Sequence, residues 1–257
     1  MKRTAAVSLF TLTIFVAGPV VAQTPTSGTL PTGEALLAKY VAATGGAAAH
    51  EAIKSRVVHA KMEIVDVGVT FSVTVYQARP DRIVTVAESD AIGRIESGVA
   101  DGVAWEKSAM RGARIKVGQE RDDAIRDATF DRLVAWKKFN KRVECVGLET
   151  VEGKQCFKVV VTPTVGSAQT IYLDPESALI VKSESNIDAP EGKFQVVSIP
   201  SDYRQVDDIK MPFSSKVFVA GQTRIVTTER VEHNVEIPAD RLALPAEIKA
   251  LVSAKQK

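Results

Sequence analysis

Two cysteines and three histidines are the side chains of this 257-residue chain best suited to redox or metal chemistry. Cys145 and Cys156 flank the turn-like segment Glu152-Gly153-Lys154, which places them on neighbouring strands of one hairpin. A redox-active pair normally has the short Cys-x-x-Cys spacing, whereas ten residues intervene here. We therefore predict a structural disulfide bond between Cys145 and Cys156, which requires a bulge or a longer loop to bring the two side chains opposite each other.

The histidines lack the spacing of a metal site. His50-Glu51 begins like the helix of a zinc protease, but Lys54 stands where the second histidine is needed. His59 is expected on the polar face of a strand, and His233 is expected near a loop. The sequence therefore predicts neither a bound metal nor a cofactor.

The sequence also lacks the common patterns of hydrolases. Asp122-Asp123 are expected to face solvent on a helix and Asp207-Asp208 belong in a hairpin turn, so neither pair suits the acid and base of a glycosidase. The chain has no Gly-x-Ser-x-Gly elbow, no Ser-x-x-Lys pair and no glycine-rich phosphate loop. We predict that the protein is not an enzyme, with a hydrolase of unrecognised site as a remaining alternative.

The first 22 residues have the pattern of an export signal. Lys2 and Arg3 precede an apolar run from Ala5 to Val16, and the small-residue site Val20-Val21-Ala22 follows. No cysteine follows the apolar run to accept a lipid. The expected product is a periplasmic protein that begins near Gln23.

The rest of the chain argues against two classes of partner. No later apolar stretch approaches the roughly 20 residues of a membrane-spanning helix, so no transmembrane segment is predicted. Without Lys2 and Arg3 the chain carries no formal net charge, so nucleic-acid binding is not predicted either.

Residues 23–33 are polar and rich in Pro and Gly, which is typical of a flexible leader. Residues 34–250 are interpreted as one domain.

The hydrophobic pattern changes from a helical to a strand period at Arg56. Helices are predicted at 34–44 and 47–54, and a further helix at 119–136 carries Ile125, Ala128, Leu133 and Trp136 on one stripe. Strict alternation predicts strands around 56–64 and 69–75, joined by a turn at 66–68. Eleven further strands are predicted at 82–88, 93–98, 103–107, 113–117, 142–150, 156–162, 169–174, 179–184, 194–204, 213–219 and 224–231.

The short intervals between these strands predict an antiparallel meander of about a dozen strands, and so wide a sheet is expected to curl. The predicted fold class is mainly β, of the α+β type: a half-open antiparallel barrel with a few helices as a lid. If the helices fill the concave side only in part, an apolar cavity remains; if they fill it, the same side chains form an ordinary core. The candidate lining of the cavity is Val58, Met62, Ile64, Val69, Phe71, Val73, Val75, Phe157, Val159 and Val161, with Ile125, Leu133 and Trp136 as lid contacts.

Several strand-and-turn segments carry a resemblance to a known family. They are the opening helix Glu34–Tyr40 that ends in Thr44-Gly45-Gly46, the segment Asp101–Trp105, the hairpin Gly147–Lys154, and the segments Tyr172–Leu179 and Asp202–Pro212. Together they span roughly residues 34–245. In these segments the chain resembles the periplasmic lipoprotein carriers LolA and LolB, the related RseB sensor domain and especially the outer-membrane lipoprotein-sorting-like proteins.

The resemblance implies an incomplete antiparallel barrel lidded by helices, which in the carriers shields lipoprotein acyl chains from water. That task needs no nucleophile or metal, because burying an acyl chain contributes about 0.8 kcal/mol per CH₂ group, or on the order of 12 kcal/mol for a 16-carbon chain. The predicted function is therefore to bind or carry lipid, lipoprotein acyl chains or another apolar ligand in the periplasm. The alternative is an RseB-type module that contacts an envelope protein.

Overall fold

The computed structural model describes residues 29–130, 132–189 and 192–255. The strands are β1 (Ser55–Ile64), β2 (Val69–Ala78), β3 (Arg82–Ser89), β4 (Gly93–Ala100), β5 (Val103–Ser108), β6 (Gly112–Ile115), β7 (Asn140–Val151), β8 (Lys154–Pro163), β9 (Gln169–Leu173), β10 (Ile180–Ala189), β11 (Gly192–Val206), β12 (Ile209–Val219) and β13 (Gln222–His233). The helices are α1 (Gly33–Ala43), α2 (Gly46–Ala52), α3 (Gly118–Ala128), α4 (Trp136–Phe139) and α5 (Ala246–Lys255), with 3-10 turns η1 (Val65–Val67) and η2 (Ala239–Leu242). The predicted export signal and most of the predicted leader lie outside the described residues.

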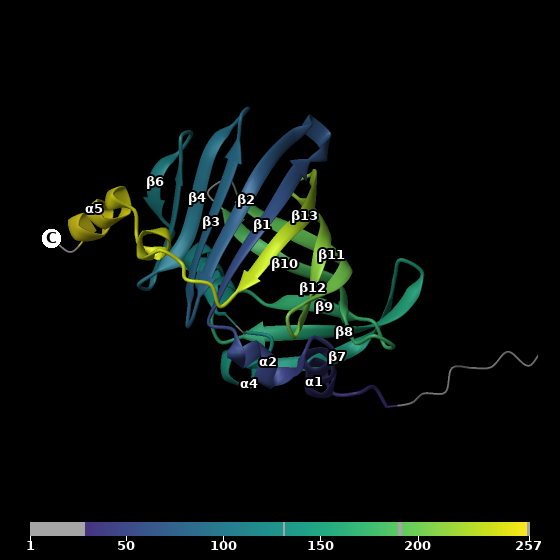
Figure 1. The fold of residues 1–257 in the computed structure, drawn as a ribbon. Coiled ribbons are helices and arrows are strands. Elements are labelled where there is room, and N and C mark those ends of the chain that lie inside the picture. The colour runs from purple at the N-terminus through teal and green to yellow at the C-terminus, as the bar shows by residue number, and fades with distance from the viewer. Residues whose placement is uncertain (1–28, 131, 190–191, 256–257) are drawn as a thin grey trace, which may run out of the picture.

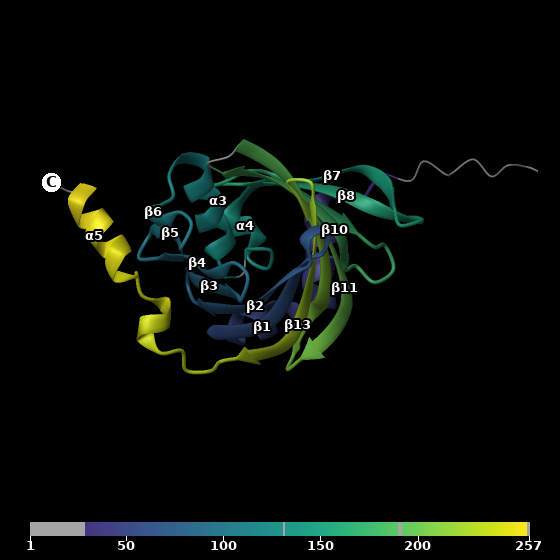
Figure 2. The ribbon, with the colours of Figure 1, turned by 90° about the horizontal axis from the view of Figure 1, so that it is seen from above.

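The thirteen strands form one antiparallel sheet in the order β6-β5-β4-β3-β2-β1-β13-β12-β11-β10-β9-β8-β7 (Figure 1). The sheet does not close, because β6 and β7 form its two opposite edges. Seen from above, α3 and α4 lie within the curve of the sheet (Figure 2). The predicted half-open antiparallel barrel with helices as a lid is thus confirmed.

The strand order differs from a single meander. The first and last strands, β1 and β13, pair in the middle of the sheet, and one meander runs outward from each. The connection between the two meanders contains α3 and α4, and both helices lie on the concave side of the sheet. The helices that cover the concave side therefore belong to the connection between the two edges.

The predicted helix at 119–136 is wrong in its length. α3 ends at Ala128, where Thr129 has an extended backbone and its hydroxyl donates to the carbonyl oxygen of Ile125 (3.2 Å). The next residue, Phe130, packs in a buried hydrophobic cluster with Ile53 and Ile209. The tertiary packing of Phe130 interrupts the helix, and α4 begins only at Trp136.

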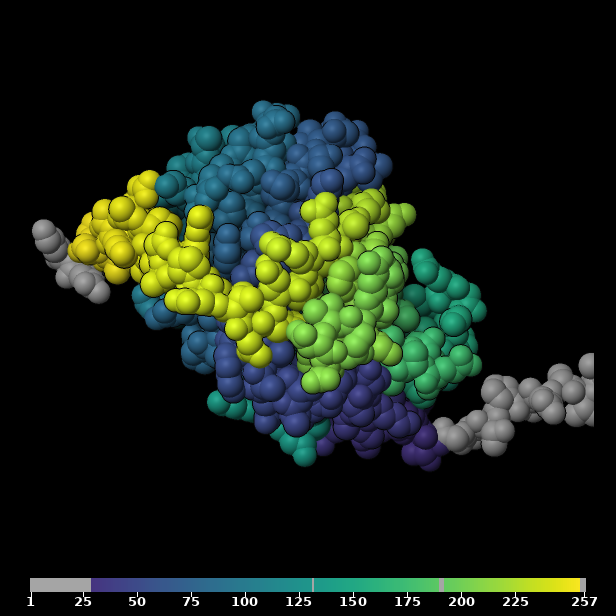
Figure 3. Space-filling model, in the orientation of Figure 1, coloured from purple at the N-terminus to yellow at the C-terminus, as the bar shows by residue number. Residues whose placement is uncertain are grey.

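The C-terminal segment covers part of the convex face of β2 to β6 (Figure 3). Leu242 of η2 and Ile248 of α5 pack against Val84, Val86 and Trp105, which are all buried. The C-terminal segment therefore acts as a second layer on the outside of the sheet.

Among the described residues, no helix is long and apolar enough to cross a membrane.

The predicted disulfide bond is wrong, because both cysteines are free. Cys145 pairs with Val159, and Cys156 pairs with Glu149. A bulge between Cys145 and Gly147 shifts the register, so Cys145 joins the concave-face cluster while Cys156 packs on the convex face. Side chains that point to opposite faces of a sheet cannot be bridged.

We expect both thiols to remain free in the folded protein. Burial raises the pKa of the Cys156 thiol, so an alkylating reagent should label Cys156 only after unfolding. A reductant should leave the thermal midpoint unchanged. Intact-mass spectrometry of the alkylated protein, with and without a reductant, checks this expectation. The expectation would be contradicted if the non-reduced protein were two hydrogens lighter than the reduced protein and took up no alkylating reagent after unfolding.

Candidate ligand-binding site

The concave face of β1 and β2 carries a ladder of apolar side chains. Its rungs, hereafter the apolar ladder, are the directly paired residues Val58 and Val75, Ala60 and Val73, Met62 and Phe71, and Ile64 and Val69. Directly paired residues share a face of a sheet. Ala60 and Phe71 are buried, whereas the other six side chains are half-buried. At about 3.3 Å per residue the run from Val58 to Ile64 is about 20 Å long, which suits a long acyl chain.

The structure divides the predicted lining residues into three groups. Phe157, Val159, Val161, Leu133 and Trp136 belong to a packed cluster with α1. Ile125 packs from α3 against β4 and β5. The seven predicted residues of β1 and β2 lie together on the apolar ladder. The first two groups are packed core clusters, so the candidate ligand surface narrows to the apolar ladder.

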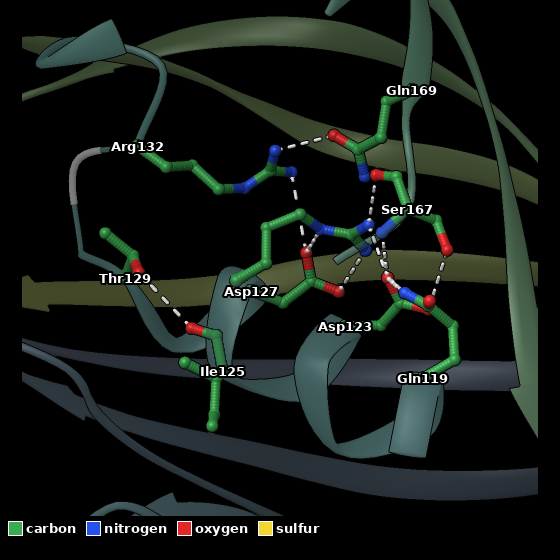
Figure 4. A network of polar contacts seen from close by, with 9 residues as sticks. Gln119, Asp123, Ile125, Asp127, Thr129, Arg132, Ser167 and Gln169 are labelled. Atoms are coloured by element: carbon green, nitrogen blue, oxygen red, sulfur yellow. Dashed lines mark hydrogen bonds and ion pairs between the residues drawn. The ribbon is translucent and has the colours of Figure 1, made fainter. Parts of the chain in front are cut away.

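Helix α3 is attached to the loop between β8 and β9 by a buried polar network (Figure 4). Arg126 is 6% exposed and donates from Nη1 to Asp123 Oδ1 (2.8 Å) and to the carbonyl oxygen of Ser167 (2.7 Å), and from Nε to Asp127 Oδ1 (2.9 Å). Asp123 also accepts hydrogen bonds from the backbone N–H (2.6 Å) and hydroxyl (3.1 Å) of Ser167. Gly166 has a φ of +89°, and a Cβ there would lie 2.9 Å from Asp123 Oδ1. The network therefore fixes α3 across the concave side.

A pocket of about 210 Å³ lies at one end of the apolar ladder. This arginine pocket is lined by Tyr40, His50, Arg56, Gln77, Asp127, Thr129, Phe130, Arg132, Leu133 and Val134. Arg56 and Gln77 form the next concave rung after Val58 and Val75, so the pocket adjoins the apolar ladder. None of the polar lining residues was among the sequence-predicted site residues.

Arg56 is held in place by a chain of hydrogen bonds. Its Nε donates to His233 Nε2 (3.2 Å), and His233 Nδ1 lies 3.0 Å from Asp207 Oδ2. His233 is the last residue of β13 and lies next to a loop, as expected, and its side chain is 1% exposed. Burial lowers the pKa of His233, which favours the neutral ring that accepts from Arg56 and donates to Asp207. The guanidinium of Arg56 also stacks on Phe130, 5.1 Å from the ring centroid.

Arg132 and Tyr40 bring a second cation and a phenol to the pocket. Arg132 Nη1 donates to Gln169 Oε1 (2.6 Å), and its Nη2 lies 3.8 Å from Asp127 Oδ1. Burial lowers the pKa of Arg132, although Asp127 opposes the shift. Burial also raises the pKa of Tyr40, and the positive charges of Arg132 and Arg56 only partly counter this. The protonated phenol is therefore a hydrogen-bond donor close to two guanidinium groups.

Comparison with solved structures finds the same architecture in other proteins. A DUF1329 family protein from Desulfovibrio piger matches with a TM-score of 0.56 and 14% identity, over 82% of this chain and 96% of that chain. A LolA superfamily protein from Nitrosomonas europaea matches with a TM-score of 0.56 and 11% identity, over 84% of this chain and 99% of that one. The chain has a LolA-like fold. A further LolA-like match, described as an outer membrane lipoprotein-sorting protein domain, comes from Vibrio parahaemolyticus (TM-score 0.53, 12% identity, 81% and 94% covered). Neither a family model nor a curated protein matches the sequence.

The concave side of the LolA-like half-barrel offers a surface that can bind a ligand. In the part of the chain that the structure describes, no three His, Cys, Asp or Glu side chains are grouped so that they could hold a metal ion. What the concave side presents is an apolar ladder that ends at a pocket with two guanidinium groups. Such a surface can bind a long molecule through dispersion and burial of apolar area.

Proposed function

We propose that this protein is a periplasmic, non-enzymatic carrier that binds lipid, lipoprotein acyl chains or another long apolar ligand along the apolar ladder. The observation that carries the proposal is the row of half-buried apolar side chains on the concave face of β1 and β2. A ligand chain that lies there loses contact with water at about 0.8 kcal/mol per CH₂ group. Similarity to a lipoprotein-sorting domain and the export pattern of residues 1–22 support the carrier role and its compartment.

Native mass spectrometry tests the proposal on the full chain, expressed with its own N-terminal segment and purified from the periplasm. We expect a bound mass that organic extraction recovers as a lipid or lipopeptide. A protein that is empty, and that also takes up no added long-chain amphiphile, would contradict the carrier proposal. An empty protein that instead co-purifies with a stoichiometric envelope protein would favour an interaction module of the RseB type.

A further inference from the structure

We propose that the arginine pocket binds the anionic head group, a phosphate or a carboxylate, of an amphiphile whose apolar tail lies along the apolar ladder. The inference rests on the proposed function and names the chemical class of its ligand. Arg56, Arg132 and Tyr40 are the head-group ligands.

The first argument is the order of the rungs. Along the concave face of β1 and β2 the polar pair Arg56 and Gln77 is followed by four successive apolar pairs. This order matches a molecule with one polar end and a long apolar chain. The pocket, at about 210 Å³, is smaller than the roughly 300–1,000 Å³ of sites that enclose a whole drug-sized ligand. Its size therefore suits a head group with a tail that continues outside it.

The second argument is charge. Among the described residues that line the pocket, two arginines accompany one carboxylate, that of Asp127. Both oxygens of Asp127 already accept hydrogen bonds from Arg126, at 2.9 and 3.1 Å, so Asp127 is shared between Arg126 and Arg132. A guanidinium group matches the geometry of phosphate and carboxylate, and bonds between charged partners are about twice as strong as neutral ones. Arg56 and Arg132 therefore bring two groups suited to a phosphate or carboxylate head group to one pocket.

Arg224 provides the competing location. It pairs with Ile64, so it lies on the same concave face at the opposite end of the apolar ladder. Its Nη2 donates to Gln222 Oε1 (3.2 Å), and its buried Nε has no hydrogen-bond partner among the described residues. Arg224 is a single guanidinium, whereas the arginine pocket gathers two guanidinium groups and a phenol. The geometry therefore favours the arginine pocket, and Arg224 supplies a matched control.

The experiment uses the protein purified from the periplasm and measures its affinities for three probes: dodecyl phosphate, dodecanol and inorganic phosphate. We expect the wild type to bind dodecyl phosphate at least about tenfold more tightly than dodecanol, since hydrogen bonds to charged groups contribute that much or more. Inorganic phosphate, which has no tail, should bind weakly and compete only at high concentration. R56Q and R132Q should each reduce the preference for dodecyl phosphate about tenfold, because losing a guanidinium weakens binding of the anionic probe more than binding of dodecanol.

Arg224→Gln should keep the preference for the anionic probe. Equal binding of dodecyl phosphate and dodecanol by the wild type would overturn the inference, as would loss of the preference in R224Q alone. Tight binding of inorganic phosphate that dodecyl phosphate does not displace would also overturn it, because the phosphate and the amphiphile would then occupy different sites. Binding of neither amphiphile would instead contradict the proposed function itself.

Folding of each variant is checked by circular dichroism. If R132Q does not fold, the probe affinities of R56Q are compared with those of R56K instead. Lysine at position 56 keeps the positive charge but lacks the planar guanidinium group. The wild type alone gives a further test: the preference for dodecyl phosphate should weaken as salt is added. A preference that does not change with salt would count against an ionic head-group contact.

Discussion

Val73→Asp is expected to weaken binding of dodecanol by about 10- to 100-fold while the protein stays folded. Val73 lies half-buried on the concave face, paired with Ala60 on one side and Ala87 on the other. In the free protein the new carboxylate keeps contact with water, but an apolar chain on the ladder would remove that water. Burying a polar group without a partner costs about 1–3 kcal/mol in proteins, which corresponds to this loss of affinity.

Ser72→Asp is the matched control for Val73→Asp. Ser72 is the preceding residue of β2, but it is exposed on the convex face and pairs with Lys61. Its other neighbour is Glu88, and the same charge is therefore added one position away, on an exposed face where it stays in contact with water. Isothermal titration of both variants with dodecanol separates the two faces of the sheet. Equal affinities in S72D and V73D would place the ligand away from the apolar ladder.

The elements of the sheet could be predicted because each has a clear hydrophobic period. Alternation in β1 and β2 assigned Val58, Met62, Phe71 and Val73 to one face, and the structure places all four on the concave face. The alternation is local, and it depends only on the pleat of each strand. The type of each element, and the face of the sheet on which each side chain lies, could therefore be predicted from the sequence.

The pairing of strands that are far apart in the sequence could not be predicted in the same way. The pairing of β1 with β13 joins residues far apart in the chain, and no local pattern encodes it. The bulge after Cys145 changes the face of one cysteine by a shift of a single residue, which spacing alone does not reveal. The break of the helix at Thr129 follows from the packing of Phe130, another contact between distant residues.

The arginine pocket was missed for a related reason. Arg56 and Gln77 continue the concave alternation of β1 and β2, so polar residues at the end of an apolar face were a visible signal of a polar site. Tyr40, His50 and Arg132 come from three other segments and meet these two only in the folded chain. The apolar part of the candidate site could thus be predicted from periodicity, whereas its polar end depends on tertiary structure.

Asp123→Ala is expected to lower the free energy of unfolding by about 3–5 kcal/mol, the usual cost of removing one partner of a buried ion pair. Asp123 is 5% exposed and accepts hydrogen bonds from Arg126 and from both the backbone N–H and the hydroxyl of Ser167. The substitution leaves the buried Arg126 with Asp127 as its remaining carboxylate partner in the described network, and leaves the Ser167 N–H without this acceptor.

The neighbouring Asp122→Ala isolates the effect of burial from that of charge. Asp122 pairs with Arg121 at 2.9 Å, and both side chains are well exposed to solvent, so the pair contributes at most about 1 kcal/mol. Urea unfolding of the two variants and the wild type measures the difference. If Asp123→Ala and Asp122→Ala shift the midpoint equally, the buried network does not hold α3 to the sheet. A large loss in Asp123→Ala alone would identify the network as the main attachment of the helix that covers the concave face beside the arginine pocket.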